Sequence, residues 1–132
     1  MPSALPDGEP VPADGALPAG ALTGLGTRPF GVYLHVPFCA ARCGYCDFNT
    51  YTGLAHLQPA FVDAAVEEVR LARRVLGAVP PVETVFVGGG TPTLLPPEHL
   101  ARLLRAVDDE LSLAPGAEVT TEANPDSVDE RS

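Results

Sequence analysis

The stretch ETVFVGGG, from Glu83 to Gly90, joins a short apolar run to three consecutive glycines. The run is rich in β-branched and aromatic residues and has the length of a buried strand, so we expect a strand at residues 83–87. Glycine has no Cβ and lets the backbone come close to a ligand. The stretch therefore predicts a strand that ends in a ligand-binding loop, with a simple tight turn as the alternative.

Amphipathic helical patterns lie on both sides of this stretch. Residues 58–76 carry apolar side chains at helical spacing, with Pro59 in the first turn and Gly77 just past the end. Residues 96–111 repeat the pattern, with Pro97 near the start and a leucine-rich stripe. Both helices are long enough to connect neighbouring parallel strands.

Further strands are expected beyond each helix. FGVYLHV at residues 30–36 is a buried-strand pattern that Pro37 ends, and residues 37–53 have the composition of a loop. AEVTTEANP predicts a strand at residues 117–123, and the following DSVDERS resembles the start of a third helix. The order βαβαβ predicts an α/β fold with parallel strands and right-handed helical crossovers.

The first 28 residues differ from the rest of the chain. They contain five prolines and five glycines and show no strand or helix period, so we expect residues 1–28 to be a disordered leader. The whole chain has 8 basic and 17 acidic residues, a net charge of −9 and no lysine, which argues against a nucleic-acid partner. No run approaches the roughly 18 apolar residues of a transmembrane segment.

All three cysteines lie within HVPFCAARCGYCDF, after the first strand, with the spacing C-x3-C-x2-C. This odd, clustered set argues against a disulfide framework and indicates a reducing compartment, by default the cytoplasm. A structural zinc site would need a fourth ligand, for which His35 and His56 are the nearby candidates. Thiolates from Cys39, Cys43 and Cys46 would instead leave one iron of a four-iron cluster open. The pattern favours an iron–sulfur cluster over zinc.

The cysteine loop, the glycines and Glu122 each follow a different predicted strand. Functional residues of parallel α/β folds gather at the carboxyl ends of the strands, so we expect all three groups at one edge of the sheet. A P-loop is excluded, since no Gly-Lys-Ser/Thr follows the glycines.

With Tyr45 just before the last cysteine, the cysteine motif resembles the signature of the radical S-adenosylmethionine (SAM) enzymes. YLHVPFCAARCGYCDF, VGGGTPTLL and TTEANPD are similar to a narrower branch, the oxygen-independent coproporphyrinogen III oxidase-like proteins, and within it to the heme chaperones. The resemblance covers residues 31–128. It implies that residues 29–132 are the N-terminal, incomplete portion of a parallel (β/α)6-type partial TIM barrel.

The resemblance also implies cofactors and the residues that hold them. Each cysteine would bind one iron of a [4Fe-4S] cluster, and SAM would occupy the fourth iron and yield a 5′-deoxyadenosyl radical. Further SAM contacts are implied at Tyr33, Tyr45, Gly89, Gly90, Thr91 and Glu122.

Structural alternatives stay open for these positions. Tyr33 could instead be an aromatic residue of the barrel core. Tyr45 could shield the cluster from water, and Glu122 could be an exposed surface glutamate. Thr91 and Thr93 could cap local backbone in the turn around the intervening proline.

Phe48 separates two branches of the family. The coproporphyrinogen dehydrogenases have a further cysteine two positions after the third ligand, where this chain has Phe48. The departure favours a heme chaperone, whose partners would be heme or porphyrin, heme-acceptor proteins and a reductant. Two alternatives stay open: an oxygen-independent coproporphyrinogen III oxidase that uses the radical, and a non-catalytic metal-binding module.

Overall fold

The computed structural model describes residues 4–39 and 51–130. The strands are β1 (Phe30–Val36), β2 (Phe38–Cys39), β3 (Tyr51–Thr52), β4 (Val82–Gly89) and β5 (Leu113–Thr121), and the α-helices are α1 (Gln58–Leu76) and α2 (Pro97–Leu111). Short 3₁₀ helices are η1 (Ala19–Leu22), η2 (Ala55–Leu57), η3 (Pro92–Leu94) and η4 (Pro125–Ser127).

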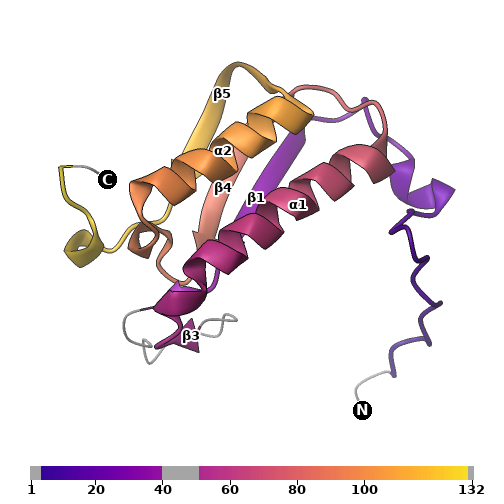
Figure 1. Cartoon of the computed structure of the whole chain (residues 1–132). Helices are drawn as coiled ribbons and strands as arrows, with labels where there is room; N and C mark the ends of the chain where they lie inside the picture. The colour runs from indigo at the N-terminus through magenta and orange to yellow at the C-terminus, as the bar shows by residue number, and fades with distance from the viewer. Residues whose placement is uncertain (1–3, 40–50, 131–132) are drawn as a thin grey trace.

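A parallel sheet with the strand order β1-β4-β5 forms the centre of the described fold. Helix α1 connects β1 to β4, helix α2 connects β4 to β5, and both helices lie on the same face of the sheet (Figure 1). The predicted α/β fold with parallel strands is confirmed. The same topology brings the carboxyl ends of the three strands to one edge.

The core lies between the sheet and the two helices. Valines of the strands, such as Val36, Val85 and Val87, pack against the apolar faces of α1 and α2. Helix α1 has a proline in its first turn and ends at Leu76, just before Gly77, whose φ of 71° is in the left-handed region that glycine favours. The bounds of β1 and α1 are those that the sequence predicts.

Strand β5 differs from its prediction at residues 117–123. It begins at Leu113 because a register shift lets Val82 pair with Leu113, after which Thr84 pairs with Glu118. Gly116, with a φ of 75°, lies within the irregular part. Strand β5 ends at Thr121, so the predicted strand residue Glu122 lies one position beyond the strand. Strand β4 is longer than predicted, because two of its glycines continue the ladder with β1.

Two further predictions are wrong in part. Residues 37–53 were expected to be a loop, but Phe38–Cys39 and Tyr51–Thr52 pair as the short parallel strands β2 and β3. A third helix was expected to start after the last strand. Up to residue 130 the structure instead has the single turn η4, where the Ser127 amide donates to Asn124.

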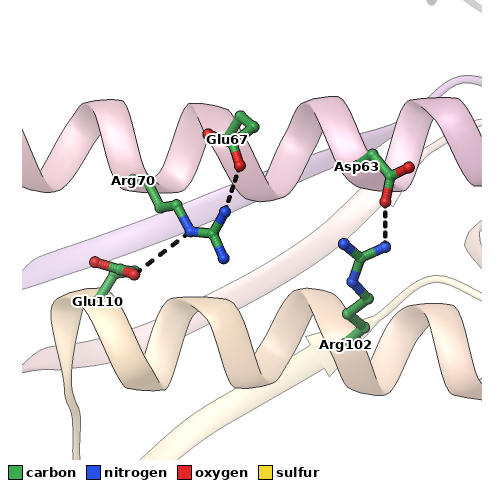
Figure 2. Close-up of polar contacts among 5 residues, drawn as sticks. All are labelled: Asp63, Glu67, Arg70, Arg102 and Glu110. Carbon is green, nitrogen blue, oxygen red and sulfur yellow. Dashed lines mark hydrogen bonds and ion pairs between the residues drawn. The ribbon is translucent and has the colours of Figure 1, made fainter.

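Ion pairs connect the exposed sides of α1 and α2 (Figure 2). Arg70 pairs with Glu67 on its own helix and lies 3.7 Å from Glu110 of α2, while Arg102 of α2 pairs with Asp63 of α1. Such exposed pairs add about 0.2–1 kcal/mol each, so packing supplies most of the stability. In the part of the chain that the structure describes, no helix has the length and apolarity needed to cross a membrane.

The segment before β1, which the sequence predicts to be a disordered leader, has little regular structure in its described residues. Between residues 4 and 29 its one helical turn is η1, which contains no buried residue. A Cβ on Gly15 would lie 3.1 Å from the side chain of Leu71, so the leader touches α1 at this point. In Figure 1 the leader lies near the carboxyl-terminal end of α1, away from the strand ends that carry the predicted site.

Candidate functional site

The predicted convergence at one edge of the sheet can be followed for three residue groups. Cys39 lies three residues after β1, Gly90 directly follows β4, and Glu122 directly follows β5. The Glu122 amide donates to the Val87 carbonyl at 2.9 Å, which continues the β4–β5 ladder by one bond. We call this edge, with Cys39, Gly88, Gly89, Gly90, Thr91 and Glu122, the rim.

Two backbone hydrogen bonds fasten the glycine segment to the segment that carries Cys39. The Gly90 amide donates to the Val36 carbonyl and the Thr91 amide donates to the Phe38 carbonyl, each at 2.7 Å. A Cβ on Gly90 would lie 2.8 Å from the Cys39 Sγ atom. The structure therefore brings Cys39 and Gly90 into direct proximity.

The other two glycines also have specific packing roles. Gly89 has a φ of 112°, and a Cβ there would lie 2.7 Å from the Val36 carbonyl oxygen and 2.9 Å from the His35 ring. A Cβ on Gly88 would lie 2.7 Å from the ring of Phe86. Gly88 and Gly89 belong to β4, so Gly90 is the one of the three glycines that lies beyond the strand, in a bend.

Tyr33 lies on the sheet face that α1 and α2 leave open. Its side chain is 55% exposed, and its hydroxyl is hydrogen-bonded to His35 Nδ1 at 2.9 Å. Its ring stacks on Phe86 with a centroid distance of 6.0 Å and an interplanar angle of 17°. In the described part of the chain Tyr33 is thus an accessible aromatic residue at the base of the rim. Sequence reasoning missed Phe86, although pairing β1 with β4 sets it beside Tyr33.

The threonines of the glycine segment differ in their contacts. Thr91 precedes η3, and its side chain makes no capping hydrogen bond there, so the capping alternative does not hold for Thr91. The Thr93 hydroxyl contacts the Ser127 hydroxyl, which also donates to the Asn124 carbonyl at 2.7 Å. This contact joins the segment after β4 to the segment after β5.

Glu122 is exposed, and its backbone amide makes the last hydrogen bond to β4 at the carboxyl end of β5. The strand register ends one residue earlier, where Val87 pairs with Thr121, so Glu122 directly follows the paired part of β5. The position is accessible to a ligand, and it also fits a surface carboxylate.

Cys43, Tyr45, Cys46 and Phe48 lie outside the described residues. Among the residues that the structure describes, no three metal-binding side chains come together, and Cys39 is the described member of the motif. The surroundings of Cys39 suit a cluster ligand: its thiol is half-buried at the carboxyl end of the sheet, and the lack of a Cβ on Gly90 lets the glycine segment lie directly against it. The observed part of the rim fits a cluster.

The chain belongs to the Radical SAM superfamily, whose family model matches residues 33–132. It is 59% identical over 104 residues to the heme chaperone HemW of Mycobacterium tuberculosis H37Rv, covering 76% of this chain and 26% of that protein. It is 42% identical to HemW of Synechocystis, in a match that covers 82% of this chain and 27% of that protein. It is 38% identical to the anaerobilin synthase of Escherichia coli O157:H7, in a match that covers 69% of this chain and 21% of that protein.

The fold matches part of a solved radical SAM barrel. Coproporphyrinogen III oxidase (HemN) of Escherichia coli, a radical SAM enzyme, superimposes with a TM-score of 0.75 at 27% sequence identity. The match covers 83% of this chain and 25% of that one. The chain thus spans about a quarter of the length of the proteins it resembles.

Proposed function

We propose that the chain is a HemW-like radical SAM protein of heme metabolism that holds a [4Fe-4S] cluster and SAM at the rim. The observation that carries this proposal is the contact between the Cys39 segment and the glycine segment at the carboxyl ends of β1 and β4. Membership of the Radical SAM superfamily supports the same cofactors. Residues 29–132 would form the N-terminal portion of the barrel domain, with residues 1–28 as a leader.

In this proposal, thiolates of Cys39, Cys43 and Cys46 hold three irons. The cluster would supply one-electron reducing chemistry to the bound SAM, with the electron coming from the reductant. The chain's own residues bind and orient the groups through backbone and side-chain contacts. SAM contacts are assigned to Tyr33, Tyr45, Gly89, Gly90, Thr91 and Glu122, with the glycine and threonine backbone at the methionine end and Glu122 as an acceptor for hydroxyl or ammonium groups.

The heme-chaperone role is the finer part of the proposal. It is supported by the 59% identity to a protein named heme chaperone and by Phe48 at the place of the additional oxidase cysteine. The ligand would be heme or a porphyrin, and the protein partners would be heme acceptors and a reductant. The use of free thiolates as ligands fits a reducing compartment such as the cytoplasm.

A second candidate is an oxygen-independent coproporphyrinogen III oxidase. The observation that favours it is the fold match to HemN, which shares the parallel strands of the described sheet. A third candidate, a metal-binding module without radical chemistry, would require only the cysteines.

Anaerobic reconstitution with iron and sulfide tests the cluster. We expect the wild-type chain to take up about four irons and four sulfides, and Cys43→Ala to lose stable cluster binding. Arg42→Ala is the matched control, because it removes the side chain next to Cys43 in the sequence without removing a thiol. Equal cluster content in Cys43→Ala, or retention of zinc in place of a cluster, would contradict the proposal.

Heme titration separates the chaperone from the oxidase. We expect the protein to bind heme saturably and to transfer it to an apo heme protein. Absorbance spectroscopy measures both the binding and the transfer. Formation of 5′-deoxyadenosine together with protoporphyrinogen from coproporphyrinogen would instead favour the oxidase. Absence of heme binding would contradict the chaperone role.

A further inference from the structure

We propose that Gly90 is a positioning residue for the Cys39 thiolate, in addition to any contact of the glycine segment with SAM. The inference rests on the proposed function, since it assigns a role to the ligand set of the cluster. The proposed role of Gly90 is to fix the position of the Cys39 thiol in the apoprotein, before the cluster binds.

The space at Gly90 is filled from one side by the segment that carries Cys39. A Cβ on Gly90 would lie 2.4 Å from the Phe38 carbonyl oxygen, 2.9 Å from the Phe38 carbonyl carbon and 2.8 Å from the Cys39 Sγ atom. Real Cβ atoms essentially never come within 3.0 Å of such atoms, so any larger side chain would displace one of them.

The requirement for glycine at this position comes from contact and not from backbone torsion. Gly89 has a positive φ, but Gly90 is not among the glycines in the left-handed region. An alanine at Gly90 therefore meets no left-handed strain, and its cost is the collision with Phe38 and Cys39.

Phe38 cannot readily move away from such a collision. Its side chain is 5% exposed and contacts the Phe61 ring edge to face, with a centroid distance of 5.4 Å. Its carbonyl accepts the Thr91 amide at 2.7 Å. Because Phe38 is fixed by the core and by this hydrogen bond, the displacement falls on the half-buried Cys39 side chain.

Two neighbouring backbone segments hold the segment that carries Cys39. The glycine segment is hydrogen-bonded to Phe38, and β3 pairs with Phe38 and Cys39. Ligand geometry in metal sites depends on such supporting contacts, and their loss typically weakens metal affinity about 10–100-fold.

The test compares Gly90→Ala with Gly31→Ala. Gly31 is a matched control near the start of β1, where a Cβ would lie 2.6 Å from the Thr84 hydroxyl, while Cys39 follows the other end of that strand. We expect Gly90→Ala to release its cluster iron to a chelator at least about tenfold faster than wild type. In the apoprotein we expect faster alkylation of Cys39 than in wild type, resolved from Cys43 and Cys46 by mass spectrometry, and neither change in Gly31→Ala.

The outcomes separate this inference from the proposed function. If wild type takes up no cluster, the proposed function fails, while alkylation of Cys39 in the apoprotein still decides the positioning role. If Gly90→Ala matches Gly31→Ala in both measurements, the positioning role is wrong.

A second variant covers the case in which Gly90→Ala does not fold. Phe61→Leu removes the ring that anchors Phe38 and keeps an apolar side chain. We expect it to accelerate alkylation of Cys39 selectively, and equal effects on all three cysteines would overturn the proposal.

Discussion

The two faces of the β1-β4-β5 sheet differ in what covers them. Beneath α1 and α2, Val36, Val85 and Val87 are almost fully buried. Neither helix covers the other face of the sheet (Figure 1). The aromatic residues Tyr33 and Phe86 of that face are 55% and 40% exposed. Stability is concentrated on the helix-covered face, while Tyr33 lies on the open face and Cys39, Gly90 and Glu122 lie at the rim.

The largest loss of stability is expected from a substitution in the core beneath the helices. Leu103 of α2 is 1% exposed, and Leu103→Ala should lower the free energy of unfolding by about 2–5 kcal/mol through lost burial and a cavity. Urea denaturation measures the change. Phe86→Ala removes more atoms from the open face and should cost less. An equal or greater loss for Phe86→Ala would contradict the division between the faces.

A smaller but local effect is expected at the rim. Gly89→Ala combines a positive φ with a Cβ 2.7 Å from the Val36 carbonyl oxygen, and it should cost about 2 kcal/mol or more. Gly116→Ala is the control, because Gly116 also has a positive φ but nothing within 4 Å of the added Cβ. The difference between the two denaturation curves measures the close packing at Gly89. No difference would show that this packing is unimportant.

The link between the segments after β4 and β5 should have a moderate effect. We expect a coupling free energy of about 0.5–1.5 kcal/mol between Thr93→Val and Ser127→Ala in a double-mutant cycle, because the two hydroxyls contact each other. The cycle removes the contribution of the separate hydrogen bond from the Ser127 hydroxyl to the Asn124 carbonyl, because Ser127→Ala loses that bond in both backgrounds. Strictly additive losses would mean that the two segments are independent.

The smallest effect is expected on the solvent-exposed sides of α1 and α2, the helices that cover the sheet. Arg102→Gln should cost about 0.2–1 kcal/mol by removing the pair with Asp63, and the loss should shrink at high salt. Arg105→Gln is the matched control on the same helix, since Arg105 has no ion pair among the described residues. The same loss in both variants, independent of salt, would contradict a role for the pair.

Much of the covered face follows from the sequence. Pro59 and Gly77 bracket an apolar stripe of helical period, and the resulting helix has the predicted bounds. Pro37 likewise ends β1 as expected, because proline has no amide hydrogen to donate. These signals are local, so they can be interpreted without knowledge of the partner strands.

The open face and rim depend on pairing between distant residues, which a single sequence does not reveal. The stack of Tyr33 on Phe86 and the early start of β5 both follow from strand register. Strands β2 and β3 have two residues each, too few for an alternating pattern. The carboxyl-end rule placed Cys39, Gly90 and Glu122 at one edge, but it did not show that Gly90 lies against Cys39.

The most direct test of the central claim, that the rim holds one cluster and SAM together, is low-temperature electron paramagnetic resonance of the reduced, reconstituted chain. We expect a reduced [4Fe-4S] signal that changes shape when SAM is added, because SAM would bind the open iron. Glu122→Gln should keep the signal and require more SAM for the same change. A wild-type signal that is absent, or that SAM leaves unchanged, would contradict the account.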